Sequence, residues 1–294
     1  MDLVHLYYFC KIAEYENVTK AARELHVAQP ALSRVIHALE KELGVSLFYR
    51  SGRHISLNEN GRILVSCAKD IFSRIEAMKE ELHDRGGAPW REKITIIVKV
   101  ASKFLPEIIS GFRQKHPDVH IVIIQNEMDD MPAADWDLKL DASREKQENE
   151  NTTCLLKEKI CLAMPKDHPL ANQKSIRLSD VSGESFLGMQ KGSSMNAIAA
   201  AYCREAGFVP NIILETDNPS TLRGLMRLGL GIAFNPVITW KEVSEEEFQL
   251  IPIADIDCCR YIHLSLNPKR YHPKVVLAFQ EYLIQFFSGL PGKN

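Results

Sequence analysis

The sequence predicts a mixed α/β chain with three parts: a small helical head, a long connecting helix and a larger α/β domain with two lobes. Three observations indicate this order. Apolar residues recur at helical spacing through residue 43, a seven-residue apolar repeat follows, and strands alternate with helices from residue 93 onward. The 294 residues are enough for two or three domains.

The composition excludes several classes of protein. Hydrophobic residues make up 45% and charged residues 25%, the balance of a soluble globular protein. No apolar run reaches the roughly 18 residues of a membrane span, and the N-terminal segment lacks the basic region of a signal peptide, so we expect a cytoplasmic location and no membrane partner. The seven cysteines are scattered without a C-x-x-C spacing, so we expect no disulfide framework, metal site or cofactor.

Three helices are predicted in the head. The first carries an apolar stripe over residues 3–13, and capping-type residues at 17–19 separate it from a short second helix at 20–25. Two alanines in this second helix permit close crossing by another helix. Residues 26–28 then form the turn into the third helix, so residues 18–37 are expected to be a helix-turn-helix.

The third helix has two distinct faces. At about 100° per residue, one face is apolar and consists of Leu32, Val35, Ile36, Leu39 and Leu43. The other face is polar and carries Gln29, Ser33, Arg34, His37 and Lys41. Gln pairs with adenine, Arg with guanine, and Ser with a base edge or a phosphate, as a recognition helix in the major groove requires. An ordinary amphipathic surface helix shows the same two faces, so this helix alone does not decide the function.

A hairpin after the third helix supports the DNA interpretation. Residues 47–48 and 55–57 are predicted strands, and the tip between them carries Arg50 and Arg53. A basic hairpin directly after a recognition helix is typical of a wing that contacts DNA. The head as a whole is nearly neutral, with seven basic and six acidic residues over 1–58. The positions of the charges therefore support DNA binding more than their sum, and a protein-binding module stays an alternative.

The head resembles the LysR-type transcriptional regulators. The residues that carry this resemblance are Ala21-Ala22-Arg23-Glu24-Leu25, Gln29-Pro30-Ala31-Leu32-Ser33-Arg34, Leu39, Glu40, Leu43, Gly44, Leu47, Phe48, Arg50, Arg53 and Gly61. The resemblance and the helix faces together give these candidate contacts to double-stranded DNA: Thr19, Gln29, Pro30, Ser33, Arg34, His37, Arg50 and Arg53. One position departs from the family, because Ala28 stands where the family usually has Ser or Thr to cap the recognition helix.

A long helix is expected between the head and the α/β domain. Asn58 is a candidate N-cap, the helix runs to about residue 85, and residues 86–89 form a hinge. Its apolar residues follow a heptad seam: Leu64, Ala68, Ile71, Ile75, Met78 and Leu82. We expect two copies to pair along this seam, which would place two heads on a two-fold DNA site. A helix that packs only on its own head would show the same stripe. The resemblance implies the dimer, commonly extended to a tetramer.

The domain plan is therefore 1–58 for the winged helix-turn-helix, 59–89 for the linker and 90–294 for a regulatory domain. Strands are predicted at 94–100, 119–124 and 136–140, with helices at 104–115 and 271–287. Residues 162–165 and 264–268 are taken as two crossings between lobes, as in type 2 periplasmic binding proteins. Lobe I is about 90–161 and 267–294, and lobe II about 162–266. This part also resembles the LysR-type effector domain, through Phe104-Leu105-Pro106, Phe112, Pro117, His168-Pro169-Leu170-Ala171, Ala206-Gly207-Phe208 and Gly229-Leu230-Gly231-Ile232-Ala233.

A cleft between the lobes is the expected ligand site. Hydroxyls and amides at helix starts are suited to a small anionic metabolite, and the candidates are Ser102, Asn126, Lys191, Ser193, Ser194, Ser220 and Thr221. Each Ser or Thr taken alone is better explained as a helix cap, and the cleft hypothesis depends on the whole set of helix starts. The stretch around Asn126 is short and acidic where the family usually has a helix, so that candidate is the least supported.

The function expected from these features is sequence-specific transcription regulation modulated by a small-molecule effector. The motifs of common enzyme classes are missing from the sequence, so an enzyme is not expected. Peroxide-sensing relatives use two cysteines in the second lobe, which leaves a thiol switch through Cys203 as an alternative. RNA polymerase is an expected further partner, since the resemblance is to regulators of transcription.

Overall fold

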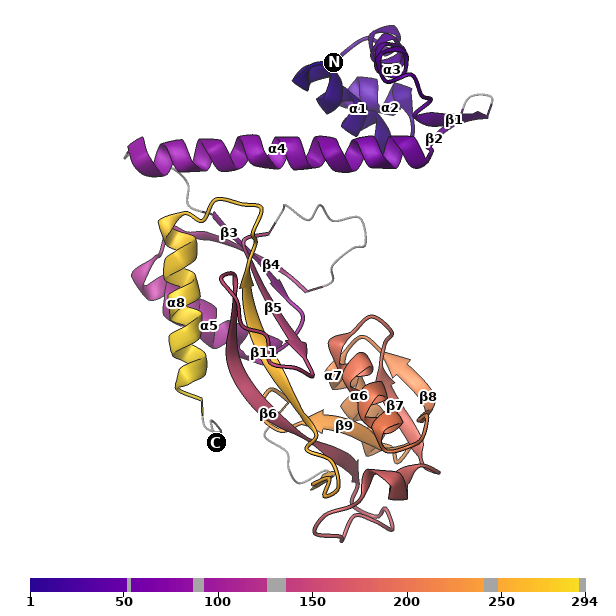
Figure 1. Ribbon diagram of the computed structural model, residues 1–294, viewed down its shortest axis with the longest axis vertical. Helices are drawn as coiled ribbons and strands as arrows, with labels where there is room; N and C mark the ends of the chain where they lie inside the picture. The colour runs from indigo at the N-terminus through magenta and orange to yellow at the C-terminus, as the bar shows by residue number, and fades with distance from the viewer. Residues whose placement is uncertain (52–53, 87–92, 126–135, 241–247, 291–294) are drawn as a thin grey trace. The chain divides into compact units, whose positions relative to one another are not determined.

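The computed structural model describes residues 1–51, 54–86, 93–125, 136–240 and 248–290. The chain divides into two compact units, one built mainly of Met1–Ala88 and the other of the α/β domain (Figure 1). Two predicted site residues, Arg53 and Asn126, lie outside the described residues, and so does the side chain of Arg50.

The head consists of three helices and a hairpin. They are α1 (Leu3–Tyr15), α2 (Val18–Glu24), α3 (Gln29–Leu43), β1 (Phe48–Ser51) and β2 (His54–Leu57). Four of the five apolar residues predicted to face inward from α3 are buried, together with Phe9 and Ile12 of α1. The fifth, Leu43, is exposed because it lies in the last turn, beyond the helices that cover the rest of that face.

Capping residues explain where α2 and α3 begin and where α3 ends. The Asn17 side chain accepts a hydrogen bond from the Lys20 N–H at 3.0 Å and starts α2. Ala28 occupies the N-cap of α3 in extended backbone and has no side-chain cap, as expected from the sequence. Pro30 follows in the first turn, where its missing N–H costs nothing. Gly44 ends the helix with φ of 71°, a left-handed conformation that favours glycine.

The connecting helix α4 (Glu59–Gly86) has 28 residues. Its start is anchored to the head, because Asn58 Oδ1 accepts from the Gly61 N–H at 2.8 Å and Nδ2 donates to the Ser46 carbonyl at 2.7 Å. Gly61 is required there, since a Cβ atom would collide with the Leu47 carbonyl. Asn58 is therefore confirmed as the residue that caps this helix.

Strands and helices alternate in the α/β domain. Within the described residues a seven-stranded sheet contains β3 (Lys93–Val98), β4 (His120–Ile124), β5 (Leu138–Ser143), β6 (Thr152–Pro165), β9 (Ala233–Pro236), β10 (Phe248–Ile251) and β11 (Cys259–Leu266). Its order is β10-β6-β11-β5-β3-β4, with β9 paired to β6, and β7 (Ser185–Met189) pairs separately with β8 (Asn211–Thr216). The other elements are η1 (Ser102–Phe104), α5 (Leu105–Lys115), η2 (Leu178–Val181), α6 (Ser194–Glu205), α7 (Pro219–Arg227) and α8 (Lys274–Ser288).

Two separate apolar cores define two lobes. The lobe I core joins β3, β5 and β11 to α5 and α8. The lobe II core joins the second half of β6 to β7, β9, α6 and α7. The long strand β6 passes through both lobes, and Figure 1 shows the helices of lobe II at the end opposite α8. The two-lobed plan expected from the sequence is therefore present.

The second crossing between the lobes differs from the expected position. Residues 264–268 were expected to form this crossing, but Ile262, Leu264 and Leu266 all lie in the lobe I core. They belong there because β11 pairs antiparallel with β5 from Tyr261 to Leu266. The chain therefore re-enters lobe I near residue 259, and the boundary of lobe II at residue 266 was placed too late.

Candidate nucleic-acid interface and ligand site

The polar face of α3 is open to solvent. Gln29, Pro30, Arg34 and His37 are exposed, and Ser33 is half-buried. Gln29 Nε2 donates to Ser33 Oγ at 3.0 Å, and Arg34 Nε lies 3.4 Å from the Pro30 carbonyl. These are weak local contacts at exposed positions, so the side chains can exchange them for base edges or phosphates.

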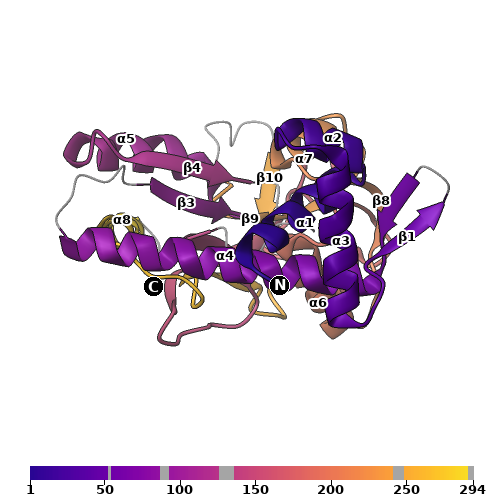
Figure 2. The same cartoon turned by 90° about the horizontal axis from the view of Figure 1, so that it is seen from above.

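The other DNA candidates lie next to α3 in the head. Thr19 is exposed in the first turn of α2, and α2 packs on α3 through the buried Ala21 and Ala22. The hairpin of the predicted wing is formed, with Phe48 opposite Leu57 and Ser51 opposite His54. Figure 2 shows it beside α3. Its two arginines, at positions 50 and 53, remain predictions, since their side chains lie outside what the structure describes.

The seam of α4 has two parts. Leu64 packs on the core of the head and Ala68 is fully buried. The rings of Tyr7 and Phe72 meet edge-to-face with their centroids 6.2 Å apart. The N-terminal half of the seam therefore packs on the head of its own chain, which was the alternative to pairing with a second copy. Further along, Ile71, Met78 and Leu82 are exposed, Met78 by 52% and Leu82 by 61%, while Ile75 is partly buried. Exposed apolar residues at heptad spacing leave this half unexplained within one chain.

The predicted ligand residues occupy the starts of helices in the α/β domain. Ser193 is the N-cap of α6, and its Oγ accepts from the Asn196 N–H at 3.1 Å. In α7 the cap is Asn218, which accepts from the N–H groups of Ser220 and Thr221. The capping alternative is therefore correct for Ser193 and wrong for Ser220 and Thr221. The remaining candidates are partly or fully exposed: Ser102 at the start of η1, Lys191 before α6 and Ser194 in its first turn.

A buried ion pair beside these helix starts was missed by the sequence analysis. Glu158 on β6 and Arg260 on β11 are register partners in the sheet, and each is 1% exposed. Arg260 Nε donates to Glu158 Oε1 at 2.7 Å. Thr239 Oγ1 donates to the same carboxylate at 2.8 Å. The pair lies where the two long strands join the lobes. In the sequence Glu158 stands between Lys157 and Lys159, a run of charges that usually faces solvent.

An ion pair joins the two lobes. Arg144, which follows β5 in lobe I, pairs with Glu205 of α6 in lobe II, and the Arg144 guanidinium lies 4.5 Å from the ring centroid of Tyr202. Lys103 of η1 donates from Nζ to the carbonyl of Ile238, which follows β9 and packs against the lobe I core.

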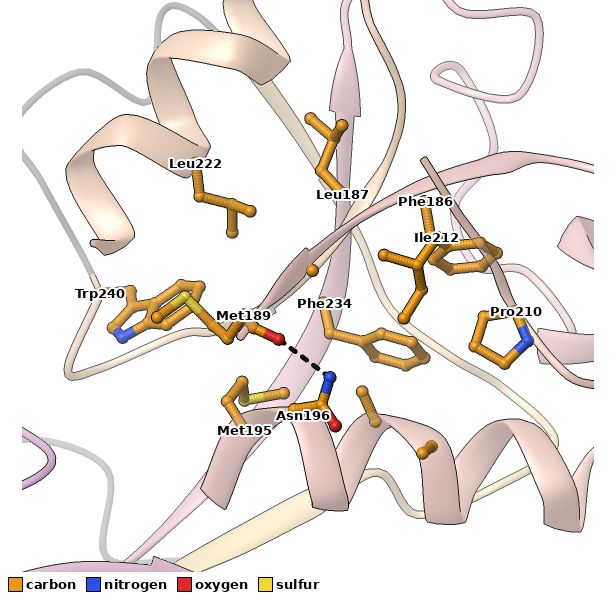
Figure 3. Close-up of a pocket in the computed structure, with 13 residues that line it drawn as sticks. Phe186, Leu187, Met189, Met195, Asn196, Pro210, Ile212, Leu222, Phe234 and Trp240 are labelled. Carbon is orange, nitrogen blue, oxygen red and sulfur yellow. Dashed lines mark hydrogen bonds between the residues drawn. The ribbon is translucent and has the colours of Figure 1, made fainter. Parts of the chain in front are cut away.

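Lobe II contains a small apolar pocket that is open to solvent. Figure 3 shows α6 along one side of it, with Trp240 and Met195 toward one end and Pro210 toward the other. Its lining is apolar except for Asn196, whose Nδ2 donates to the Met189 carbonyl at 2.9 Å. Small-molecule sites commonly combine an apolar lining with few polar groups.

The cysteines of lobe II are poorly suited to a thiol switch. Cys203 is fully buried, and burial raises the pKa of its thiol to about 12. Burial first, and then the neighbouring carboxylate of Asp255, raises the pKa of the Cys258 thiol to about 12. Both groups are thiols at neutral pH, whereas the thiolate is the reactive form.

Within the described part of the chain, no group of three or more His, Cys, Asp or Glu side chains is placed to hold a metal ion. Among the same residues, no helix combines the length and the apolar character needed to cross a membrane.

Comparison with known proteins decides the family. The model of the bacterial regulatory helix-turn-helix protein, lysR family, matches residues 3–62, and that of the LysR substrate binding domain matches residues 91–288. The chain belongs to the LysR family. It is a DNA-binding transcription regulator with an effector-binding domain, which confirms the resemblance and the fold class expected from its sequence.

Individual relatives of this LysR-family chain are named as regulators. The transcriptional dual regulator GltC of Bacillus subtilis (strain 168) is 34% identical over 297 residues, which cover 99% of each chain. A hydrogen peroxide-inducible genes activator of Escherichia coli O157:H7 is 29% identical over 245 residues, 81% of this chain and 80% of the relative. The solved structure of full-length CbnR with its target DNA has 19% identity, a TM-score of 0.66, and coverage of 97% of this chain and 99% of that one.

Proposed function

We propose that this LysR-family regulator recognises double-stranded DNA through the exposed face of α3. The observation that carries the proposal is the division of that helix: Leu32 and Leu39 are fully buried, while Gln29 and Arg34 face solvent. A helix anchored this way presents one fixed set of side chains to the major groove. Thr19 and Ser33, with Pro30, His37, Arg50 and Arg53, complete the predicted contacts.

Two copies are proposed to act together. The exposed half of the seam, with Ile71, Met78 and Leu82, gives each copy an apolar stripe that a second α4 would cover. A two-fold dimer then presents two α3 helices to two half-sites on the operator. A tetramer and contact with RNA polymerase follow from the family resemblance alone.

The ligand is proposed to be an anionic metabolite held between the lobes. Helix starts carry exposed N–H groups and the positive end of the helix dipole, both of which favour an anion. Ser102 of lobe I and Lys191, Ser193, Ser194, Ser220 and Thr221 of lobe II lie at or near such starts. Asn126 stays a prediction outside the described residues. Binding there would change how the lobes are held, and with them the heads on DNA.

The DNA contact is tested by replacing Arg34. We expect Arg34→Ala to weaken binding to the DNA upstream of the protein's own gene by about tenfold or more, because one arginine–base pairing contributes about 1–3 kcal/mol. Fluorescence anisotropy of labelled DNA measures the affinity, and circular dichroism checks the fold. Lys174→Ala removes an exposed cation from the other unit and should leave the affinity unchanged. Equal affinity of Arg34→Ala and the wild type would refute the assignment.

A further inference from the structure

We propose that lobe II holds a site for an amphipathic carboxylate. The apolar body of the ligand lies in the pocket of Figure 3, and its carboxylate takes the place of the Met195 sulfur at the guanidinium of Arg260. The inference rests on the proposed ligand-dependent function and specifies the chemical class of the ligand.

Arg260 has donors that the surrounding residues use poorly. A guanidinium carries five N–H groups and no acceptor. Nε is taken up by Glu158, and Nη2 donates to Thr239 Oγ1 at 2.7 Å. For Nη1, the acceptor among the described residues is the thioether of Met195, at 3.7 Å. Sulfur is a weak acceptor, and a buried donor that lacks a strong one is costly. Nη1 of the buried Arg260 is thus bound by a weak acceptor, the Met195 sulfur, which a stronger acceptor could replace.

The carboxylate of Glu158 is fully hydrogen-bonded without Nη1 of Arg260. Its Oε1 accepts from Arg260 Nε and Thr239 Oγ1, and its Oε2 accepts from the backbone N–H groups of Ile238 and Thr239 at 3.1 and 2.9 Å. Four donors satisfy the two oxygens of a carboxylate. The Glu158 side chain is therefore fixed by its own partners, and Nη1 points away from it toward Met195.

The charge of Arg260 also favours an anion, because hydrogen bonds between an ionised guanidinium and a carboxylate are stronger than those between neutral groups.

Met195 connects this cation to the apolar pocket. It lies in the first turn of α6 and is one of the residues that line the pocket. The other large side chains there are apolar: Phe186, Met189, Ile212, Leu222, Phe234 and Trp240. Methionine is unbranched and flexible, so its side chain can swing aside without disturbing the helix. A ligand with a carboxylate at one end and a short apolar chain would then satisfy both surfaces.

The binding test uses hexanoate as the probe and the full-length protein. Trp240 lines the pocket, and the variants Trp90→Phe and Trp136→Phe leave it as the remaining fluorophore of three tryptophans. We expect hexanoate to change Trp240 emission and to bind at least about tenfold more tightly than hexanamide, which lacks the charge, or acetate, which lacks the chain. No response to hexanoate at millimolar concentration, or equal binding of hexanamide, would overturn the inference.

Two variants assign the binding to these residues. Ala199→Leu fills the pocket from α6 and should abolish hexanoate binding. Arg260→Gln alone would strand a buried Glu158, so it is combined with Glu158→Gln. This double variant should bind hexanoate and hexanamide equally, whereas retained selectivity for hexanoate would contradict the role of Arg260.

Failure of this site is separable from failure of the proposed function. The DNA affinities of the wild type and of Arg34→Ala, both measured in the absence of hexanoate, report on α3 alone. If hexanoate does not bind while DNA binding depends on Arg34, the carboxylate site is wrong and the DNA function stands. If the wild type does not bind DNA, the proposed function fails whatever hexanoate does.

Discussion

His263 shows how burial sets the protonation state of a single residue. It lies on β11, is 4% exposed, and its Nε2 accepts a hydrogen bond from the Gln147 N–H at 3.0 Å. An accepting Nε2 carries no proton, so the ring is neutral. Burial lowers the pKa of His263 below its ordinary value of 6.5, while the carboxylates of Asp141 and Glu148 oppose the shift. Protonation would cost this hydrogen bond as well as the burial of a charge.

We therefore expect His263 to make the α/β domain less stable at mildly acid pH. The unfolded chain takes up the proton at a higher pH than the folded chain, so the free energy of unfolding falls as pH drops below about 6.5. Above that pH the residue has no effect. Urea denaturation at pH 7.5 and 5.5 measures the change. His263→Gln keeps an acceptor without a titrating group, and the decrease should be smaller than in the wild type; a decrease of equal size would contradict this.

Glu158 and Arg260 mark the limit of prediction from single residues. In the sequence Glu158 stands between Lys157 and Lys159, and Arg260 follows two cysteines; such charges usually face solvent. What buries them is the pairing of β6 with β11, which sets residue 158 beside residue 260. The hydroxyl and backbone N–H of Thr239 then complete the carboxylate's partners. Contacts between residues so far apart in the chain leave no periodic signal, so the sequence analysis missed them.

The helix α3 lacks a side-chain cap at its N-terminus, and this should limit its stability. Its N-cap is Ala28, with φ −71° and ψ 132°, a conformation that a serine cap also adopts. A hydroxyl at this position would accept from an N–H of the first turn, so Ala28→Ser should stabilise α3 by about 1 kcal/mol. Slower hydrogen–deuterium exchange in peptides from residues 29–37 would show it.

Asn17→Ala provides the matched control for this cap. Asn17 caps α2 through the Lys20 N–H, so its loss should speed exchange in residues 18–24 by a similar factor. If Ala28→Ser exchanged as fast as the wild type while Asn17→Ala exchanged faster, the start of α3 would not be limited by its missing cap.

Most helices and strands were predictable, because periodic apolar patterns determine them locally. The head's helices and hairpin, the connecting helix and the strand–helix alternation all follow such patterns. The end of lobe II could not be predicted in this way, because the sequence of β11 has the same pattern whichever lobe the strand joins. Only its register with β5 decides that Ile262 and Leu264 enter the lobe I core. The pocket of lobe II likewise depends on packing between α6 and β7, which no local pattern records.

At the scale of the whole molecule, the exposed half of α4 predicts self-association. Met78→Glu places a charge in the seam and should shift the protein from dimer to monomer at micromolar concentration, because an apolar interface does not accommodate an unpaired charge. Analytical ultracentrifugation measures the change. Ser66→Glu adds the same charge at an exposed position on the opposite side of the helix and should leave the assembly intact. Dissociation by both variants, or by neither, would argue against the seam.

The central claim is that two copies of this regulator place two α3 helices on one operator. Hydroxyl-radical footprinting of the full-length protein on the DNA upstream of its own gene tests this most directly. The account predicts two protected stretches related by two-fold symmetry, with centres about one helical turn, or a multiple of it, apart, and both should be lost in Arg34→Ala. A single protected stretch, or two stretches that persist in Arg34→Ala, would contradict it.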